Sequence, residues 1–285
     1  MLSRLVVIAG AGSYPRLIVE GAKRAGVAQV DVVAVSGSTE RATRRAADSV
    51  IPVTLGTIAA GIRAVGRGGY DGAILAGQVN PLSLFSGRFD EEVTAWLDEL
   101  PVKNAHSVFS KLIEKIEAAG VRVLPASLFL DGSIPGEGVL TARGFTEQEA
   151  SDVAHAQRVA HDVGLHDVGQ TVMVKRGMVL AVEAFEGTNR AIRRGGRLGG
   201  AGSVLFKAAR EGHDMRFDIP VVGLKTLKIM KRAGATALGF QAGRLVLLDR
   251  EEVIAYANRH GIAIVGVDSG LPPAPLRPEE AGGAS

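Results

Sequence analysis

The first 125 residues alternate between short apolar runs and segments with helical spacing, and this alternation restricts the fold more than any other feature. The run at residues 5–9 (LVVIA) has the length and composition of a buried strand, and a glycine-rich turn separates it from a helical segment. Strands that alternate with helices favour a parallel, doubly wound sheet. The expected strands are 5–9, 31–36, 73–75 and 121–124, and the expected helices are 15–23, 90–99 and 107–119. We therefore predict an α/β fold.

A change of composition at residues 131–138 (DGSIPGEG) marks the expected domain boundary, because glycine and proline dominate there. Beyond it the chain again mixes helical segments with strands, which predicts a second α/β domain. Strand pairs are expected at 171–174 with 178–185 and at 235–240 with 245–249. The expected divisions are a first domain at 1–131, a linker at 132–145, a second domain at 146–270 and a disordered tail at 271–285.

Charge and cysteine content exclude several classes of protein. The chain has 33 basic and 30 acidic residues, a net charge of +3, and no basic run interleaved with aromatics. We therefore expect no nucleic-acid partner, although an anionic substrate or membrane surface stays open. The absence of cysteine excludes disulfides, thiolate metal sites and cysteine nucleophiles. Since no stretch reaches the roughly 18 apolar residues of a membrane span, and no secretory signal is recognisable, we expect a cytoplasmic protein.

Residues 213–219 alternate strictly between two faces of an expected strand. Asp214, Arg216 and Asp218 share one face, and Pro220 ends the strand because it has no N–H to donate. Two carboxylates at a strand-to-helix turn suit a hard divalent cation such as Mg²⁺. The same pattern also fits a salt ladder on an exposed strand. The residues alone leave both interpretations open.

Two glycine-containing loops follow expected strands. The first loop, residues 10–15 (GAGSYP), opens a helix, and the second, which contains Gly77 and Gln78, follows the strand expected at 73–75. The N–H groups at a helix N-terminus attract phosphate. The spacing lacks the full dinucleotide fingerprint, so a tight turn between strand and helix is the alternative. Ligands of open α/β sheets collect at the carboxyl ends of strands, so both loops are expected to line one crevice. The nucleotide-binding candidates are Gly10, Gly12, Ser13, Pro15, Gly77 and Gln78.

Two glutamates bracket the end of the strand expected at 178–185. Glu183 interrupts an apolar run, where an ionised carboxylate is costly unless it is paired or bound to metal, and Glu186 precedes a helix for which Thr188 is the expected N-cap. The structural alternative is a buried Glu183 paired with Arg190, Arg193 or Arg194. Lys207 ends another apolar run seven residues before Asp214, where it would hold phosphate or simply meet solvent.

Together these segments resemble the LpxI-type UDP-2,3-diacylglucosamine pyrophosphatases of lipid A biosynthesis. The resemblance spans nearly the whole chain and is carried by residues 8–12 with Pro15, 76–79, 167–170, 179–188, Lys207, 214–220 with Gly223, and 242–243 before Asp249. It implies a Rossmann-like N-terminal domain that handles the uridine nucleotide and a catalytic, acyl-binding C-terminal domain. It also implies hydrolysis with Mg²⁺, for which Mn²⁺ is a substitute, that releases UMP and 2,3-diacylglucosamine 1-phosphate (lipid X).

By this resemblance Asp218 matches an essential aspartate of the family and is expected to bind metal or activate water, with Asp214 in support. Arg216 and Lys207 are expected to neutralise the diphosphate, and the expected metal ligands are Asp218, Glu183 and Glu186. We also expect a homodimer with peripheral contact to the inner face of the membrane that holds its lipid substrate.

The chain departs from the usual family pattern in the region 103–106 and at two further positions. Asn189 replaces an aspartate, and Val221 replaces a threonine. These differences leave open a hydrolase or a non-catalytic binding protein for another nucleotide-diphosphate conjugate. An NAD(P) oxidoreductase is the remaining alternative.

Overall fold

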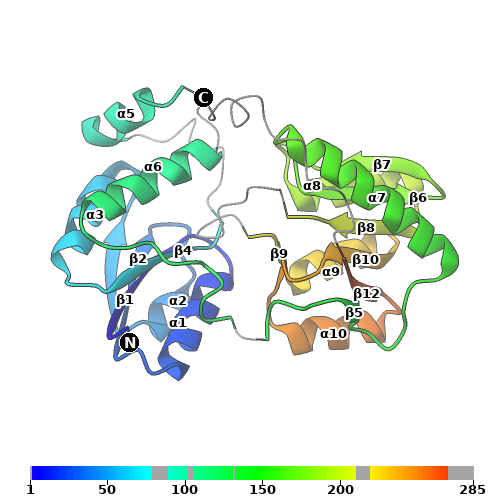
Figure 1. Cartoon of the computed structure of the whole chain (residues 1–285), viewed down its shortest axis with the longest axis horizontal. Helices are drawn as coiled ribbons and strands as arrows, with labels where there is room; N and C mark the ends of the chain where they lie inside the picture. Colours follow the sequence, from blue (N-terminus) through cyan, green and yellow to red (C-terminus); the bar gives the residue numbers. More distant parts are fainter. Residues whose placement is uncertain (1, 79–88, 102–104, 131, 210–218, 269–285) are drawn as a thin grey trace, which may run out of the picture. The chain divides into compact units, whose positions relative to one another are not determined.

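The computed structural model describes residues 2–78, 89–101, 105–130, 132–209 and 219–268. Within these, the chain forms two compact units, the first from the residues up to 130 and the second from 132–209 and from 220 on (Figure 1). Both units combine a sheet with helices, so the predicted class of two α/β domains is confirmed. Asp214, Arg216, Asp218 and the tail 271–285 lie outside the described residues.

The sheet of the first unit is parallel, with the strand order β3-β2-β1-β4. Its strands are β1 (Arg4–Ala9), β2 (Gln29–Val35), β3 (Ser49–Val53) and β4 (Gly72–Ala76). Nearly every residue of the central strand β1 is buried, as expected for a parallel strand covered on both faces. All four carboxyl ends lie at one edge, where the loops after β1 and β4 begin.

Helices cover both faces of this sheet. One face packs in a core cluster with α3 (Ile58–Arg67) and α6 (Ala105–Ala118), through side chains such as Ile62 and Ile116. The other face carries α1 (Tyr14–Arg24), whose Ile18 and Val19 are fully buried. The unit also contains α2 (Arg41–Ala46), the short turn η1 (Leu55–Thr57) and α5 (Glu91–Asp98).

The second unit is built on a six-stranded mixed sheet in the order β5-β12-β10-β8-β6-β7. Its strands are β5 (Gly138–Val139), β6 (Thr171–Lys175), β7 (Met178–Val182), β8 (Ser203–Lys207), β10 (Ala235–Gln241) and β12 (Ala263–Val267). Strands β8, β10 and β12 are parallel to one another, whereas β6 runs antiparallel to both β8 and β7. A separate parallel pair joins β9 (Val221–Val222) to β11 (Val246–Leu247).

Two core clusters lie on opposite faces of this sheet. On one face, α7 (Glu147–Leu165) packs through Val153 and Ala156 against Phe206. On the other, α8 (Thr188–Gly199), α9 (Leu224–Arg232) and α10 (Arg250–Arg259) share a cluster that includes Ile192 and Leu205. Among the described residues of both units, no helix is long and apolar enough to cross a bilayer.

Two expected strand assignments are wrong. Residues 121–124 make only an isolated bridge from Val123 to Ala73, and Pro125 follows directly without an N–H to extend a ladder. Residues 245–249 contain β11, which pairs with β9 and not with β10. Strand β10 already has β8 and β12 on its two sides, so it has no free edge. The edge strand β3 was not expected, since it contains Pro52, which an edge tolerates.

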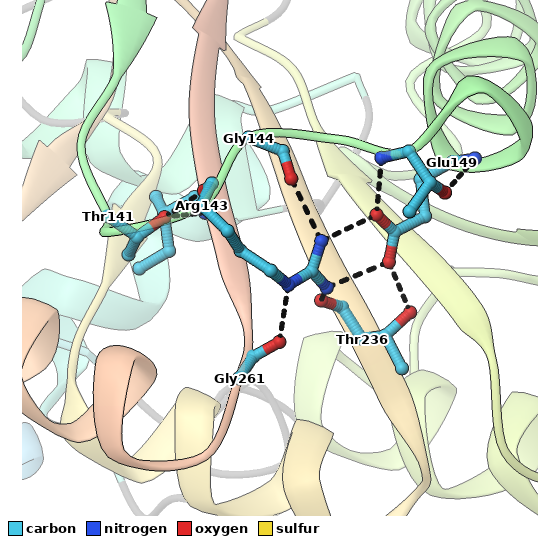
Figure 2. Close-up of polar contacts among 8 residues, drawn as sticks. Thr141, Arg143, Gly144, Glu149, Thr236 and Gly261 are labelled. Atoms are coloured by element: carbon cyan, nitrogen blue, oxygen red, sulfur yellow. Dashed lines mark hydrogen bonds and ion pairs between the residues drawn. The ribbon is translucent and has the colours of Figure 1, made fainter.

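Residues 132–145, expected as a linker, belong to the second unit. Strand β5 pairs with β12, and Arg143 binds Glu149 of α7 through both guanidinium Nη atoms, at 2.7 and 2.9 Å (Figure 2). Arg143 also donates to the carbonyl oxygens of Thr236 and Gly261, at 2.6 and 2.7 Å. The segment is therefore fixed to a helix, to strand β10 and to the turn before β12.

Candidate functional site

Three polar residues lie in one row across strands β7, β6 and β8 of the second unit. Lys207, the last residue of β8, lies opposite Thr171, the first residue of β6. Glu183 directly follows β7 and donates its N–H to the Thr171 carbonyl at 2.8 Å. Residues opposite one another on neighbouring strands direct their side chains to the same face of a sheet. The row therefore gathers a carboxylate, a hydroxyl and an ammonium group.

The row faces helix α8. Met173 and Leu205 lie two residues from Thr171 and Lys207 on their strands, and both pack in the same cluster as Ile192 of α8. Side chains two residues apart on a strand point to the same side. The polar row therefore lies on the same side of the sheet as this core cluster, at the end of the sheet where α8 begins.

Thr188, the first residue of α8, joins two members of the row. Lys207 Nζ donates to Thr188 Oγ1 at 3.1 Å, and Thr188 Oγ1 donates to Glu183 Oε1 at 2.8 Å. A hydroxyl has one proton, and an ionised carboxylate can only accept. The proton of Thr188 therefore points to Glu183, and a lone pair faces Lys207.

The expected N-cap at Thr188 is wrong, because the cap position is Gly187, with a φ of 80°, and no side chain caps the helix. The structural alternative, a pairing of Glu183 with Arg190, Arg193 or Arg194, is not found among the described residues, where Glu183 accepts from Thr188. Arg194 binds Glu186 at 2.5 Å and the Val182 carbonyl at 2.8 Å. This hydrogen bond from Arg194 lowers the pKa of Glu186, so Glu186 is ionised and already occupied.

Burial makes this cluster unusual. Lys207 is only 7% exposed, and lysines are rarely buried unless they are paired. Glu183 Oε2 and Thr171 Oγ1 are buried and have no hydrogen-bond partner in the described part of the chain. An unpaired buried carboxylate oxygen is costly, so a ligand atom or water is the expected partner.

In the first unit, the loops after β1 and β4 pair with each other. Gly10 donates to the Ala76 carbonyl at 2.8 Å, and Ala11 and Gln78 exchange two backbone hydrogen bonds, at 2.8 and 2.9 Å. A Cβ on Gly10 would lie 2.6 Å from the Gln78 carbonyl oxygen, so only glycine allows this approach. The structure thus brings the two expected loops together at the carboxyl edge of the sheet.

The N-terminus of α1 lies next to this loop pair, because a Cβ on Gly77 would be 2.9 Å from Pro15 Cγ. Gly12 has a φ of 92°, and a Cβ there would meet nothing within 4 Å. Ser13 occupies the N-cap position without a side-chain cap, and Pro15 lies in the first turn, as expected. Gly77 has a φ of 95°, and a Cβ there would lie 2.8 Å from the Ala11 carbonyl oxygen.

Each unit matches one domain model of a single family. Residues 4–133 match the LpxI N-terminal domain, and residues 136–265 match the LpxI C-terminal domain. The chain belongs to the LpxI family. The two LpxI matches meet close to the boundary between the two compact units.

A curated LpxI protein is also similar to this chain. It is the UDP-2,3-diacylglucosamine pyrophosphatase LpxI of Caulobacter vibrioides, 32% identical over 174 residues. The match covers 58% of this chain and 62% of that protein. Among solved structures, a biotin carboxylase from Campylobacter jejuni matches with a TM-score of 0.24 and 13% identity, covering 70% of this chain and 42% of its own. A likeness this weak supports no conclusion about the fold or function of this chain.

Within the part of the LpxI C-terminal domain that the structure describes, no group of three or more histidine, aspartate or glutamate side chains could hold a metal ion. Glu183 fits a metal ligand, because its Oε2 is a buried carboxylate oxygen without a hydrogen-bond partner among the described residues. Glu186 fits less well, since Arg194 occupies it. Asp214 and Asp218 lie outside the described residues.

Thr171 and the role of Thr188 are not apparent from the sequence. Thr171 begins a strand of otherwise apolar residues, and only its register opposite Lys207 shows that it belongs to the row. Thr188 is predicted from the sequence only as a helix cap. Thr188 follows Glu183 by five residues, but this spacing does not predict their hydrogen bond, because the direction of the Thr188 side chain depends on how α8 packs.

Proposed function

We propose that this LpxI-family chain hydrolyses the diphosphate of UDP-2,3-diacylglucosamine to UMP and 2,3-diacylglucosamine 1-phosphate. The family membership and the curated relative's printed activity support this proposal. The observation that carries it is the buried Lys207, held by Thr188 in a row with Glu183 at the end of strand β8. A buried ammonium group beside an unsatisfied carboxylate suits a substrate that carries negative charge.

The reaction adds one water across the phosphoric anhydride. The water oxygen forms a bond to one phosphorus, the bridging P–O bond breaks, and its electron pair leaves with the other phosphate. Negative charge grows on the phosphoryl oxygens as this bond breaks. Cationic groups close to those oxygens stabilise the transition state, and we assign this role to Lys207 and Arg216.

We assign metal binding to Glu183 and Asp218, with Asp214 and Glu186 in support. Mg²⁺ prefers oxygen ligands, and Glu183 Oε2 is a carboxylate oxygen of the second unit with no hydrogen-bond partner among the residues that the structure describes. When bound, Mg²⁺ or Mn²⁺ would lower the pKa of a coordinated water and offset charge on the diphosphate. Asp218 would also orient the attacking water.

The first unit is the proposed site of the uridine nucleotide. Its strand order β3-β2-β1-β4 is that of the nucleotide-binding half of doubly wound sheets, and its paired loops lie at the carboxyl edge, where such sheets bind ligands. We assign phosphate contact to Gly10, Gly12 and Ser13 at the start of α1, because a helix N-terminus attracts anions. Pro15, Gly77 and Gln78 would shape the same loops.

The test is release of UMP from UDP-2,3-diacylglucosamine by the full-length protein, with Mg²⁺, with Mn²⁺ and with EDTA. We expect release that depends on the metal and is lost in Lys207→Met and Asp218→Asn. If UMP release does not depend on metal, the proposed activity is correct and the proposed role of the metal is wrong. If wild-type protein releases no UMP from this substrate but cleaves another nucleotide-diphosphate conjugate, the substrate assignment is wrong. We also propose that the protein is cytoplasmic and acts as a homodimer. Sedimentation of the purified protein tests whether it is a dimer.

A further inference from the structure

Helices α8 and α9 of the second unit form a surface with an unusual charge. Each helix carries four basic residues and no acidic residue: Arg190, Arg193, Arg194 and Arg197 on α8, and Lys225, Lys228, Lys231 and Arg232 on α9. The whole chain has a net charge of only +3, so the remainder of the chain is net acidic. The positive charge is therefore concentrated on these two helices.

The two helices share one side of the sheet. Ile192 of α8 and Leu227 and Met230 of α9 are buried in the same core cluster. The helices also lie close together, because a Cβ on Gly196 would be 2.5 Å from the Cβ of Ala233. Their outward faces therefore form one continuous surface.

Seven of these eight cations are exposed, and the described part of the chain gives them no anionic partner. Arg194, which binds Glu186, is the exception. Across the described ranges, none of the other seven takes part in a salt bridge. Such a surface is available to an external polyanion.

Exposed apolar side chains border these cations. Leu198, at the end of α8, is 68% exposed, and Met178, in the hairpin between β6 and β7, is 65% exposed. Lys175 Nζ donates to the Gly199 carbonyl at 2.5 Å and so holds the hairpin next to the end of α8. Cations combined with protruding apolar side chains are typical of proteins that lie on a membrane surface.

We propose that α8, α9 and the β6–β7 hairpin form a docking surface, here called the basic surface, for a bilayer that contains anionic lipid. Helix α8 also connects the basic surface to the candidate site, because its first residue is Thr188. Neither helix contains an aromatic side chain on which bases could stack, which disfavours a nucleic acid. The choice of a membrane over other polyanions rests on the proposed lipid substrate.

The test is sedimentation of the full-length protein with vesicles of phosphatidylcholine alone or mixed with phosphatidylglycerol. We expect binding only to the mixed vesicles, and its loss in high salt, because salt screens exposed charges. Arg193→Glu and Lys228→Glu, on separate helices, should each weaken vesicle binding by about tenfold or more, since each basic residue near an anionic surface contributes measurably.

Arg158→Glu is the matched control, because Arg158 is exposed on α7, which packs against the opposite face of the sheet. It changes the net charge by the same amount and should leave vesicle binding unchanged. Circular dichroism checks that all three variants are folded. Equal binding to neutral vesicles, or equal weakening by Arg158→Glu, would overturn the proposal, as would a preference for single-stranded RNA over mixed vesicles.

Vesicle binding requires no substrate, so this test and that of the proposed function fail separately. If the protein binds mixed vesicles but releases no UMP, the basic surface stands and the activity does not. If it hydrolyses substrate dispersed in detergent but ignores vesicles, the activity stands and the basic surface does not. Lys228→Glu should hydrolyse detergent-dispersed substrate at the wild-type rate and substrate in anionic vesicles more slowly.

Discussion

At the scale of single residues, Glu149 illustrates how hydrogen bonds can outweigh burial. Burial alone would raise its pKa, yet hydrogen bonds from Arg143, from the Thr236 hydroxyl and from the Thr146 N–H lower it from 4.5 to about 2 (Figure 2). A carboxyl group with a lowered folded-state pKa stabilises the fold above its unfolded-state pKa. This stabilisation is therefore complete above about pH 4.5 and disappears as the pH falls toward 2.

Arg143→Met should reduce the free energy of unfolding by about 2 kcal/mol at neutral pH, because it leaves a buried carboxylate without its main partner. The difference from wild type should shrink as the pH falls below 4.5, since wild type then loses the ion pair as well. Urea denaturation across this pH range measures both effects. Arg16→Met is the control: it removes a partly exposed pair with Glu20, four residues away on α1, and should cost about 0.5 kcal/mol or less. A constant difference at all pH values would contradict this account.

Thr188 is the residue whose hydroxyl we expect to matter most for catalysis. Thr188→Val keeps the shape of the side chain but removes the bond to Glu183 and the acceptor for Lys207. A hydrogen bond to a charged group contributes enough that kcat should fall by about tenfold or more. Measurement of kcat and KM for UMP release tests this expectation.

Thr188→Ser should restore most of the activity, because serine keeps the hydroxyl. Ser203→Ala is the matched control, since Ser203 begins the same strand β8, and its buried hydroxyl has no hydrogen-bond partner among the described residues. If the serine variant were as slow as the valine variant while both melted like wild type, the hydroxyl of Thr188 would not be the group that matters for catalysis.

The row shows which parts of a site a sequence can predict. Glu183 and Lys207 could be singled out because Glu183 interrupts an apolar run and Lys207 ends one. Thr171 could not, because its position next to Lys207 depends on strand register, which pairing between distant segments decides. The pairing of Glu186 with Arg194 likewise depends on how α8 turns after Gly187.

At the scale of elements, the glycine loops of the first unit have a structural role that is independent of any ligand. Gly77→Ala should lower the free energy of unfolding by about 2 kcal/mol or more, because a left-handed φ of 95° disfavours a side chain and the Cβ would clash with Ala11. Thermal and urea denaturation measure this loss. Gly12→Ala separates the two causes: its φ is similar, at 92°, but its Cβ meets no atom, so about 1 kcal/mol is expected. Equal losses in both variants would show that the clash contributes nothing.

Element type was easier to predict from the sequence than strand partners. The alternation of apolar runs and helical segments predicted β1, β2, β4 and α1, because local spacing encodes them. Strand β11 was found, but its partner was not, since the partner depends on which strands already flank β10. The edge strand β3 is hard to predict because it contains a proline and only Val53 is buried, whereas β4, of the same length, is buried throughout.

At the scale of the whole molecule, the two units have separate cores and separate proposed tasks. The core of the first unit is built from the β1–β4 sheet and its helices, and the cores of the second from the six-stranded sheet and its own helices. This division predicts that each ligand binds to one unit and changes hydrogen exchange in that unit only. UMP should bind in the first unit, and acidic lipid should bind at the basic surface of the second.

Hydrogen–deuterium exchange on the full-length protein can test this division of tasks. UMP should slow exchange in peptides that contain residues 10–15 and 77–78, because a bound phosphate would occupy N–H groups at the start of α1 and hold the paired loops closed. Peptides from α7 should exchange as in the free protein, since α7 belongs to the second unit. Inorganic phosphate is the control ligand, and it should protect the same loops more weakly because it lacks the uridine. Protection confined to the second unit would place the nucleotide beside Lys207 and would remove the assigned role of the glycine loops.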